Sequence, residues 1–242
     1  MISDVHGNVF ALRAVLAAVA GLDVDALVNL GDHLSGAVAP AETAELLQRT
    51  PALSVRGNHD RFLVELPRER MGRADRAAFD GLTPSSRAWL AALPQRLDVA
   101  PGVLAFHGVP GDDEVMLLET ITRAAIRPAT VEEVSERLGD WSDGYALMLC
   151  GHSHLQRSVQ LPGGTLVVNP GSVGWPALAA TGTLSAPIEA GTPHARFAVA
   201  DDAAGRWTAD FHAVKYPWDD AAALAERNGR ADIARQLRTG RV

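Results

Sequence analysis

A carboxylate and an imidazole stand close together near the start of the chain, in Asp4-Val5-His6. If this segment is extended, residues two apart point to the same side, so Asp4 and His6 can bind one cation together. Carboxylate oxygen with imidazole nitrogen suits a first-row metal such as manganese, iron or zinc. Taken alone, the pattern also fits a chance surface turn, so its meaning depends on the rest of the chain.

A second polar run, Arg56-Gly57-Asn58-His59-Asp60, follows the short apolar stretch 52–55. Gly57 allows the backbone to turn sharply after a strand. Asn58 can offer its carbonyl oxygen to a metal, and His59 can carry a proton. The run therefore predicts an active-site loop, although a polar turn between a strand and a helix is the alternative for this stretch alone.

Other potential ligands also follow short apolar stretches, at 26–30, 103–106 and 145–150. Such stretches are typical of parallel strands buried on both faces. With the two runs above, they give seven groups that can bind metal: Asp4, His6, Asp32, Asn58, His107, His152 and His154. Asp32 lies in the middle of the set and can bridge two cations through its two oxygens, so that seven residues fill two sites.

The elements that must position these groups alternate between strand and helix. Apolar residues recur at helical spacing over 10–19, with Asn8 as the N-cap, and a second helix is expected over 41–48. The first sixty residues therefore predict a β-α-β-α-β order and a parallel sheet. Ligands of such sheets bind at the carboxyl ends of the strands, which is where the polar groups stand.

The rest of the chain is predicted to complete a single domain of residues 1–242, with helical insertions at 61–95 and 111–143. A long loop over 175–194 is expected to be functional or an interaction surface. The remaining elements are two hairpins and two terminal helices, at 157–168, 195–214, 219–227 and 231–238.

Composition limits the class of protein. Of the 242 residues, 47% are hydrophobic, which is enough for a sizeable core, and the net charge of −7 argues against a general nucleic-acid or membrane-surface role. The single cysteine, Cys150, excludes an internal disulfide and fits a reducing compartment. Since no apolar run is long enough to span a bilayer and no secretory signal is evident, a cytoplasmic protein without a membrane partner is expected.

In this order and rough spacing, the motifs D-x-H, G-D, G-N-H-D, H-G and G-H-S-H resemble the calcineurin-like metallophosphoesterase superfamily. The resemblance runs from residue 4 to about residue 174, and Asn169–Gly174 resembles a sequence common in small bacterial phosphodiesterase-like members. It implies an α/β fold built as a four-layer α/β/β/α sandwich, with two mixed sheets flanked by helices.

The resemblance also implies a centre of two divalent metal ions, of manganese, iron or zinc. One ion would be held by Asp4, His6, Asp32 and His154, and the other by Asp32, Asn58, His107 and His152. A metal-bridging hydroxide would attack phosphorus, and His59 would protonate the leaving oxygen, so Asp32 and His59 are the expected catalytic residues.

Contacts to the substrate are expected from Arg56, Asn58 and His33. The alternative for Arg56 is a solvated surface residue, and His33 can also simply cap its loop. The helical insertions and the 175–194 loop could wall the site and restrict it to small molecules.

The chain departs from the family pattern at three places, one of which is the additional imidazole of His33 close to the centre. Only Met1-Ile2-Ser3 precede Asp4, which predicts a very short first strand or a truncated start. Ser35 stands where protein phosphatases with G-D-x-x-D-R-G carry a second aspartate, which disfavours a phosphoprotein substrate and leaves the partner of His59 open, with Asp60 as one candidate.

The sequence therefore predicts a dimetal phosphodiesterase or phosphomonoesterase acting on a small phosphoester. A catalytically silent scaffold with the same fold is the first alternative, but such a scaffold would be expected to lose ligands or His59. A nuclease is the second, and the acidic charge and the absence of a basic, aromatic-rich run argue against a nucleic-acid polymer as partner. Assembly into a homo-oligomer is left open.

Overall fold

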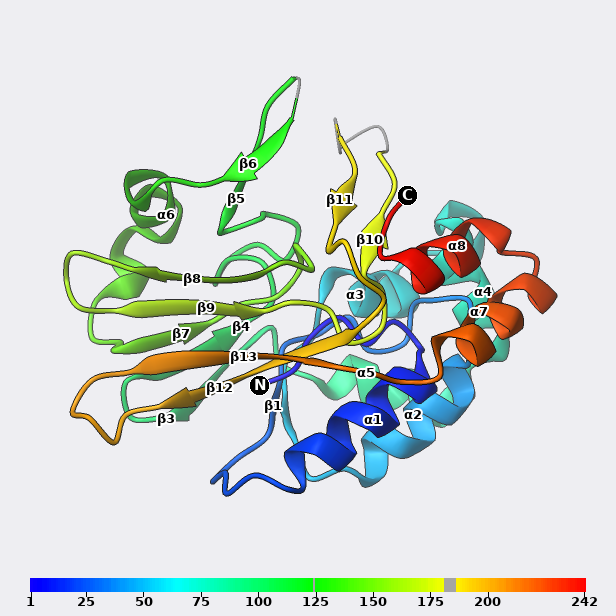
Figure 1. The fold of residues 1–242 in the computed structure, drawn as a ribbon, viewed down its shortest axis with the longest axis horizontal. Helices are drawn as coiled ribbons and strands as arrows, with labels where there is room; N and C mark the ends of the chain where they lie inside the picture. The colour runs from blue at the N-terminus through cyan, green and yellow to red at the C-terminus, as the bar shows by residue number, and fades with distance from the viewer. Residues whose placement is uncertain (124, 181–185) are drawn as a thin grey trace.

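A five-stranded mixed sheet forms one half of the structure, a computed structural model that describes residues 1–123, 125–180 and 186–242 (Figure 1). Its inner strands β4, β7 and β9 run parallel, and the outer strands β3 and β8 are antiparallel to their neighbours. The inner strands consist of buried residues, as short apolar runs predict. In sheet order the strands are β3 (Arg96–Ala100), β4 (Val103–Phe106), β7 (Leu147–Leu149), β9 (Leu166–Pro170) and β8 (Gln156–Gln160).

The N-terminal residues join two further strand pairs. β1 (Val28–Asn29) pairs in parallel with β2 (Leu53–Ser54), and β12 (Ala195–Asp201) pairs antiparallel with β13 (Thr208–Val214). Ile2 bonds to the backbone beside β1, and the Met1 backbone exchanges hydrogen bonds of 2.8 and 3.1 Å with Ala198 on β12. Residues 1–2 therefore lie between the two pairs and connect them.

Three clusters of buried apolar side chains hold these layers together. One lies between the two sets of strands and contains Leu30, Val103 and Leu149. The second packs helices α1 (Val9–Val19), α2 (Pro40–Arg49), α7 (Trp218–Arg227) and α8 (Ala231–Thr239) against β12. The third packs α6 (Val131–Leu138) against the five-stranded sheet, on the opposite side of the molecule (Figure 1). The predicted α/β fold class is confirmed.

The segment 61–95 is helical, as predicted. It contains most of α3 (Asn58–Glu65), the 3₁₀ turn η1 (Arg68–Arg70), α4 (Arg73–Gly81) and α5 (Pro84–Ala92). The expected cap of α1 is present, since the side chain of Asn8 accepts a hydrogen bond there, and Thr83 and Thr130 cap α5 and α6 in the same way. No helix within the described ranges is long and apolar enough to cross a membrane.

The prediction of a helical insertion at 111–143 is wrong in its first half. There the chain forms an antiparallel hairpin of β5 (Glu119–Ile121) and β6 (Ile126–Pro128), in which Ile121 faces Ile126. Pro128 cannot continue a hydrogen-bonded ladder or sit inside a helix, so helix begins only at α6, and the turn η2 (Gly139–Ser142) follows it.

The 175–194 segment, predicted as a loop, carries another antiparallel pair, β10 (Ala177–Leu178) and β11 (Ile188–Glu189). Residues 181–185 of that segment lie outside the described ranges. The two antiparallel pairs β5–β6 and β10–β11 extend toward the same side of the molecule, and β10 lies beside α8 (Figure 1).

Candidate metal centre

All seven predicted ligands lie together at the ends of the strands. Within each of two groups the potential ligand atoms lie within 4.8 Å of one another: Asp4, His6 and His154 in one, and Asp32, His107 and His152 in the other. The side-chain oxygen of Asn58 lies 3.1 Å from Nε2 of His107 and so belongs to the second group.

Each of the imidazoles in the first group has one nitrogen committed to the backbone. Nδ1 of His6 donates to the carbonyl of Ser35 at 2.7 Å, and Nδ1 of His154 donates to the carbonyl of Trp175 at 2.6 Å. The Nε2 atoms of the two rings are left to face each other, at 3.1 Å. A hydrogen bond that fixes one ring nitrogen in this way is the usual support of a metal-binding histidine.

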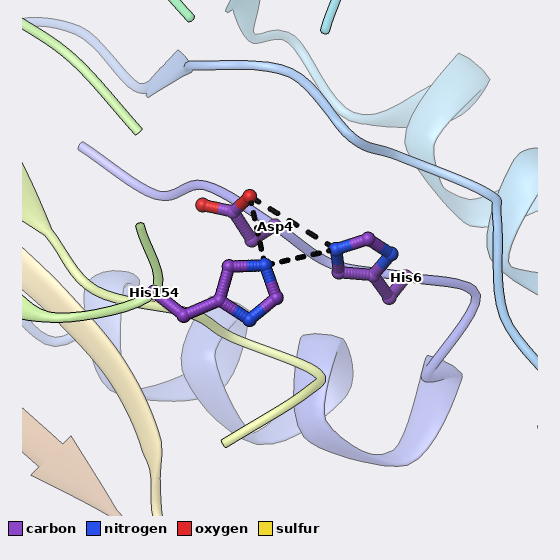
Figure 2. A group of neighbouring side chains, drawn as sticks. All are labelled: Asp4, His6 and His154. Atoms are coloured by element: carbon purple, nitrogen blue, oxygen red, sulfur yellow. Dashed lines mark hydrogen bonds and ion pairs between the residues drawn. The ribbon is translucent and has the colours of Figure 1, made fainter. Parts of the chain in front are cut away.

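Asp4 completes this group with a third acceptor, as Figure 2 shows. Its Oδ1 is 3.3 Å from Nε2 of His154 and 4.0 Å from Nε2 of His6. The carboxylate is fully buried, and Oδ1 receives no hydrogen bond in the described structure. Three acceptors that point at one another without a donor repel unless a positive charge lies between them, so the group fits a divalent cation.

The second group is built in the same way. Nδ1 of His107 donates to the carbonyl of Leu30 at 2.7 Å. Its Nε2 then faces Oδ1 of Asn58 at 3.1 Å and Oδ2 of Asp32 at 3.3 Å. Oxygen and nitrogen acceptors again converge, so this group also fits a divalent cation.

Asp32 stands between the groups. Its Oδ2 lies 3.3 Å from Nε2 of His107 and 3.7 Å from Nε2 of His6. Its Oδ1 accepts a 2.9 Å hydrogen bond from the backbone N–H of His59, which fixes the carboxylate. This position is the one that a bridging ligand would need.

The loop that leads into the β5–β6 hairpin supports the last imidazole. Nε2 of His152 donates to the carbonyl of Glu114 at 3.0 Å, which leaves Nδ1 for a metal. Arg61 holds the same loop through Asp113 and Glu114, at 2.7 and 2.6 Å. Arg61 is therefore occupied in positioning this loop.

The buried groups of the centre shift one another's pKa, upward at His107 and downward at Asp4 and His6. Burial opposes the charge on His107, but Asp32 overrides it and raises the pKa of His107 to about 10. Burial also opposes ionisation of Asp4, but His154 lowers the pKa of that carboxyl to about 2. Burial and His154 together lower the pKa of His6 to about 4, so its ring stays neutral and can act as a ligand.

The backbone of the centre is strained. Five residues other than glycine have positive φ in the described ranges, and every one is a predicted ligand: Asp4 (54°), His6 (47°), Asp32 (56°), His152 (70°) and His154 (61°). This conformation costs about 1–2 kcal/mol for a residue with a Cβ atom, and such strain clusters at functional sites. At Gly57 a Cβ atom would overlap the Asp32 carboxylate, so only glycine fits there.

His59 lies beside the centre and has a carboxylate partner that the sequence did not reveal. Its Nδ1 lies 2.7 Å from Oδ1 of Asp75 on α4, and Oγ of Ser35 donates to the same oxygen at 2.6 Å. The side chain is 30% exposed, whereas Asp75 is buried. Burial opposes protonation of His59, but Asp32 and Asp75 raise its pKa to about 9, so the ring carries a proton at neutral pH.

The prediction of Asp60 as the partner of His59 is wrong. Its carboxylate instead accepts backbone hydrogen bonds from Asp32, His33 and Gly57, at 2.9, 2.9 and 3.0 Å. Asp60 therefore ties the Gly-Asp turn after β1 to the start of α3.

Two residues predicted to contact substrate lie elsewhere. His33 is fully buried, and its Nδ1 lies 2.7 Å from Oδ2 of Asp60. Arg56 pairs with Glu65 at 3.2 Å. Neither lines the cavity in front of the centre, because each is turned toward a carboxylate of α3; of the predicted substrate contacts only Asn58 lines it.

That cavity has a volume of about 530 Å³. It is lined on one side by residues of the centre, namely His6, Asp32, Asn58, His59, His152 and His154. The potential ligands are therefore accessible to a small molecule, with His59 at the same opening.

The chain was compared with known proteins both by sequence and by fold. A family model described as the calcineurin-like phosphoesterase superfamily domain matches residues 1–187. An uncharacterised protein of Methanocaldococcus jannaschii is 40% identical over 60 residues, which span 25% of this chain and 25% of that protein.

Two solved structures share nearly the whole fold. A metallophosphoesterase from Sphaerobacter thermophilus has a TM-score of 0.73 at 23% identity and covers 99% of this chain and 98% of its own. A hypothetical protein from Pyrococcus horikoshii OT3 has a TM-score of 0.78 at 17% identity, with coverage of 99% and 96%. At these identities the likeness concerns the fold.

Proposed function

Because the chain belongs to the calcineurin-like phosphoesterase superfamily, we propose that it is a dimetal phosphodiesterase that hydrolyses a small phosphate ester. The observation that carries this proposal is the convergence of potential metal ligands in two adjacent groups, with Asp32 between them. Manganese, iron and zinc suit this mixture of carboxylate, amide and imidazole ligands. When bound, two such ions polarise the phosphoryl oxygens and make water nucleophilic at neutral pH.

The residues of the chain have distinct tasks in this proposal. Asp32 is shared by the two metal sites, and Asn58 supplies a neutral oxygen to one of them. His59 holds its proton against Asp75 through Nδ1, which leaves Nε2 to protonate the leaving oxygen. His33 and Arg56 have no part in substrate binding, because both are engaged with carboxylates outside the cavity.

Asp75 takes over a task that the sequence motif had left unfilled. Ser35 stands where the protein-phosphatase motif has an aspartate, and it donates to Asp75, which reaches His59 from α4. The carboxylate beside His59 is thus supplied from another element. Ser35 orients that carboxylate by donating a hydrogen bond to its Oδ1.

Asp75→Asn is expected to lower kcat by roughly 10–100-fold, the usual effect of removing a supporting partner, while leaving metal content unchanged. The amide keeps the size and hydrogen-bonding capacity of the side chain but cannot stabilise a protonated His59. The loss should be larger for alkyl than for nitrophenyl esters, because alkoxides need the proton more. Asp80→Asn on the exposed face of the same helix is the control, and an equal loss on both esters would contradict the positioning role.

The proposed function is tested with protein freed of metal by chelation and reloaded with manganese, iron or zinc. We expect two ions per chain and hydrolysis of small phosphodiesters, with little turnover of a phosphopeptide or of single-stranded DNA. Two bound ions without hydrolysis of any ester would favour the silent scaffold. Efficient cleavage of the peptide or the DNA, with the small esters left intact, would contradict the substrate class.

A further inference from the structure

The cavity extends beyond the metal centre into a part that no metal ligand lines. The apolar wall of this outer part consists of Phe62, Met116, Ile121, Trp175 and Leu178. A volume of about 530 Å³ is within the range of sites that take small organic ligands. A phosphoryl group at the centre would leave this part for the organic group of the substrate.

Two aromatic rings stand where the centre ends and the outer cavity begins. The ring of Trp175 meets His6 edge to face, with centroids 5.0 Å apart. The ring of Phe62 meets His59 in the same way at 5.5 Å. A group attached to a phosphorus atom at the centre can therefore lie beside these rings, which offer faces and edges for a planar ligand.

Hydrogen-bond donors without partners line the same outer part, and both come from the C-terminal helix α8 and its N-cap. Gln236 is 4% exposed; its Oε1 accepts from Nε1 of Trp175 at 2.7 Å, and its Nε2 has no partner in the described chain. Arg230 is 9% exposed, and its Nη1 is buried without a partner. Leaving a buried donor such as Nη1 of Arg230 unpaired costs about 1–3 kcal/mol, and the amide of Gln236 offers a further donor, so a ligand with acceptors would be stabilised here.

The charge of this end of the cavity is balanced. Nε and Nη2 of Arg230 donate to the carboxylate of Asp232 at 2.9 and 2.8 Å, and Asp232 also lines the cavity. A second phosphate would lie against that carboxylate. A neutral planar group suits this end of the cavity better. Acceptors at its edge can bind the amide of Gln236 and the guanidinium of Arg230, and a donor can bind the carboxylate of Asp232.

We propose that the organic group of the substrate is a nucleoside, with its base against Trp175 and its edge toward Gln236 and Arg230. The assignment rests on the proposed function in one respect, because it assumes that the phosphoryl group binds at the metal centre. The predicted substrate class is then a nucleotide phosphoester.

Binding is tested first, without turnover. Saturation-transfer NMR on metal-free and metal-loaded protein compares thymidine 5′-monophosphate with deoxyribose 5-phosphate, which lacks the base. We expect transfer to the base protons and about tenfold tighter binding of the nucleotide, corresponding to one good hydrogen bond with some stacking. Equal binding of the two ligands would overturn the proposal.

Two variants locate the base. Gln236→Glu keeps the side-chain length and the acceptor for Trp175 but removes the free donor, and Arg230→Met removes the guanidinium. In both, the preference for the nucleotide over deoxyribose 5-phosphate should fall to about twofold or less. Arg238→Met is the matched control, because Arg238 lies on the same helix but pairs with Glu226 outside the cavity; it should keep the preference.

Hydrolysis then separates the two proposals. The methyl and thymidine 5′ esters of 4-nitrophenyl phosphate share one leaving group, so the ratio of their kcat/KM values reports the nucleoside alone. We expect a ratio of about ten that is lost in both variants. A ratio near one in the unmodified protein, or pyrophosphate that displaces the nucleotide only when Arg230 is present, would overturn the nucleoside assignment. If neither ester is hydrolysed with two metals bound, the proposed function fails, and the NMR comparison still decides whether the base is bound.

Discussion

Asp32→Ala is expected to remove both metal ions and to reduce hydrolysis to background. The carboxylate is within 3.3 Å of His107 and 3.7 Å of His6, so it is the group shared by the two candidate sites. Loss of a shared ligand weakens both sites at once, and we expect each affinity to fall by more than about 100-fold, beyond the effect of removing a supporting residue. This loss is checked by measuring the metal content per chain after dialysis against buffer low in free metal.

His154→Ala is the internal comparison for this experiment. His154 contacts Asp4 and His6, and it belongs only to the first group. We expect this variant to retain about one ion per chain, whereas Asp32→Ala should retain none. Circular dichroism establishes that both variants are folded. Two fully occupied sites in Asp32→Ala would refute the bridging position.

His59→Ala is expected to keep both metal ions and to lower turnover by roughly 10²–10⁴-fold, the usual contribution of general acid catalysis. Its imidazole contacts Asp75 and, more weakly, Ser35, and only its backbone N–H reaches Asp32. Removing the ring therefore leaves the ligand atoms in place.

The dependence on leaving group distinguishes a proton donor from a residue that only positions substrate. Esters of alcohols need protonation of the departing oxygen, whereas nitrophenolate leaves without it, so the loss should be greatest for the alkyl esters. His194→Ala serves as the control, because His194 packs against Trp218 away from the cavity. A similar loss on every ester would indicate positioning, and loss of metal would indicate that His59 is needed to hold the centre together.

Most of the potential ligands could be found from the sequence because they lie within a few residues of the end of a short apolar stretch. His107 comes immediately after β4, and Asp32 is three residues beyond β1. Parallel strands place their carboxyl ends at one edge of the sheet. Local sequence patterns were therefore enough to predict that residues distant in the chain lie close together.

Asp75 could not be found in that way. It stands in the first turn of α4, where an acidic residue is common because it interacts well with the helix dipole. Nothing in its neighbourhood distinguishes it from such a residue, whereas Asp60, next to His59, looked like the better partner. Asp75 rather than Asp60 reaches His59 because α4 packs against α3. That packing depends on side chains over the whole helical segment.

The residues of the outer cavity could not be predicted from the sequence either. Gln236 lies in a predicted terminal helix to which no function was assigned, Arg230 directly precedes that helix, and Ile121 lies in a three-residue strand. Strands of this length are too short for a period of two to be recognised. Charged faces of helices usually point to solvent, so burial of Gln236 follows only from the contact of α8 with Trp175.

The left-handed backbone at five of the ligands has a consequence for how this protein can evolve. Glycine would be the most relaxed residue at each of these positions, but it carries no ligand atom. Selection for a more stable fold and selection for a working centre therefore act in opposite directions at the same five residues. Lineages that no longer need the centre would be free to accept glycine there, and a gain in stability would accompany the loss of activity.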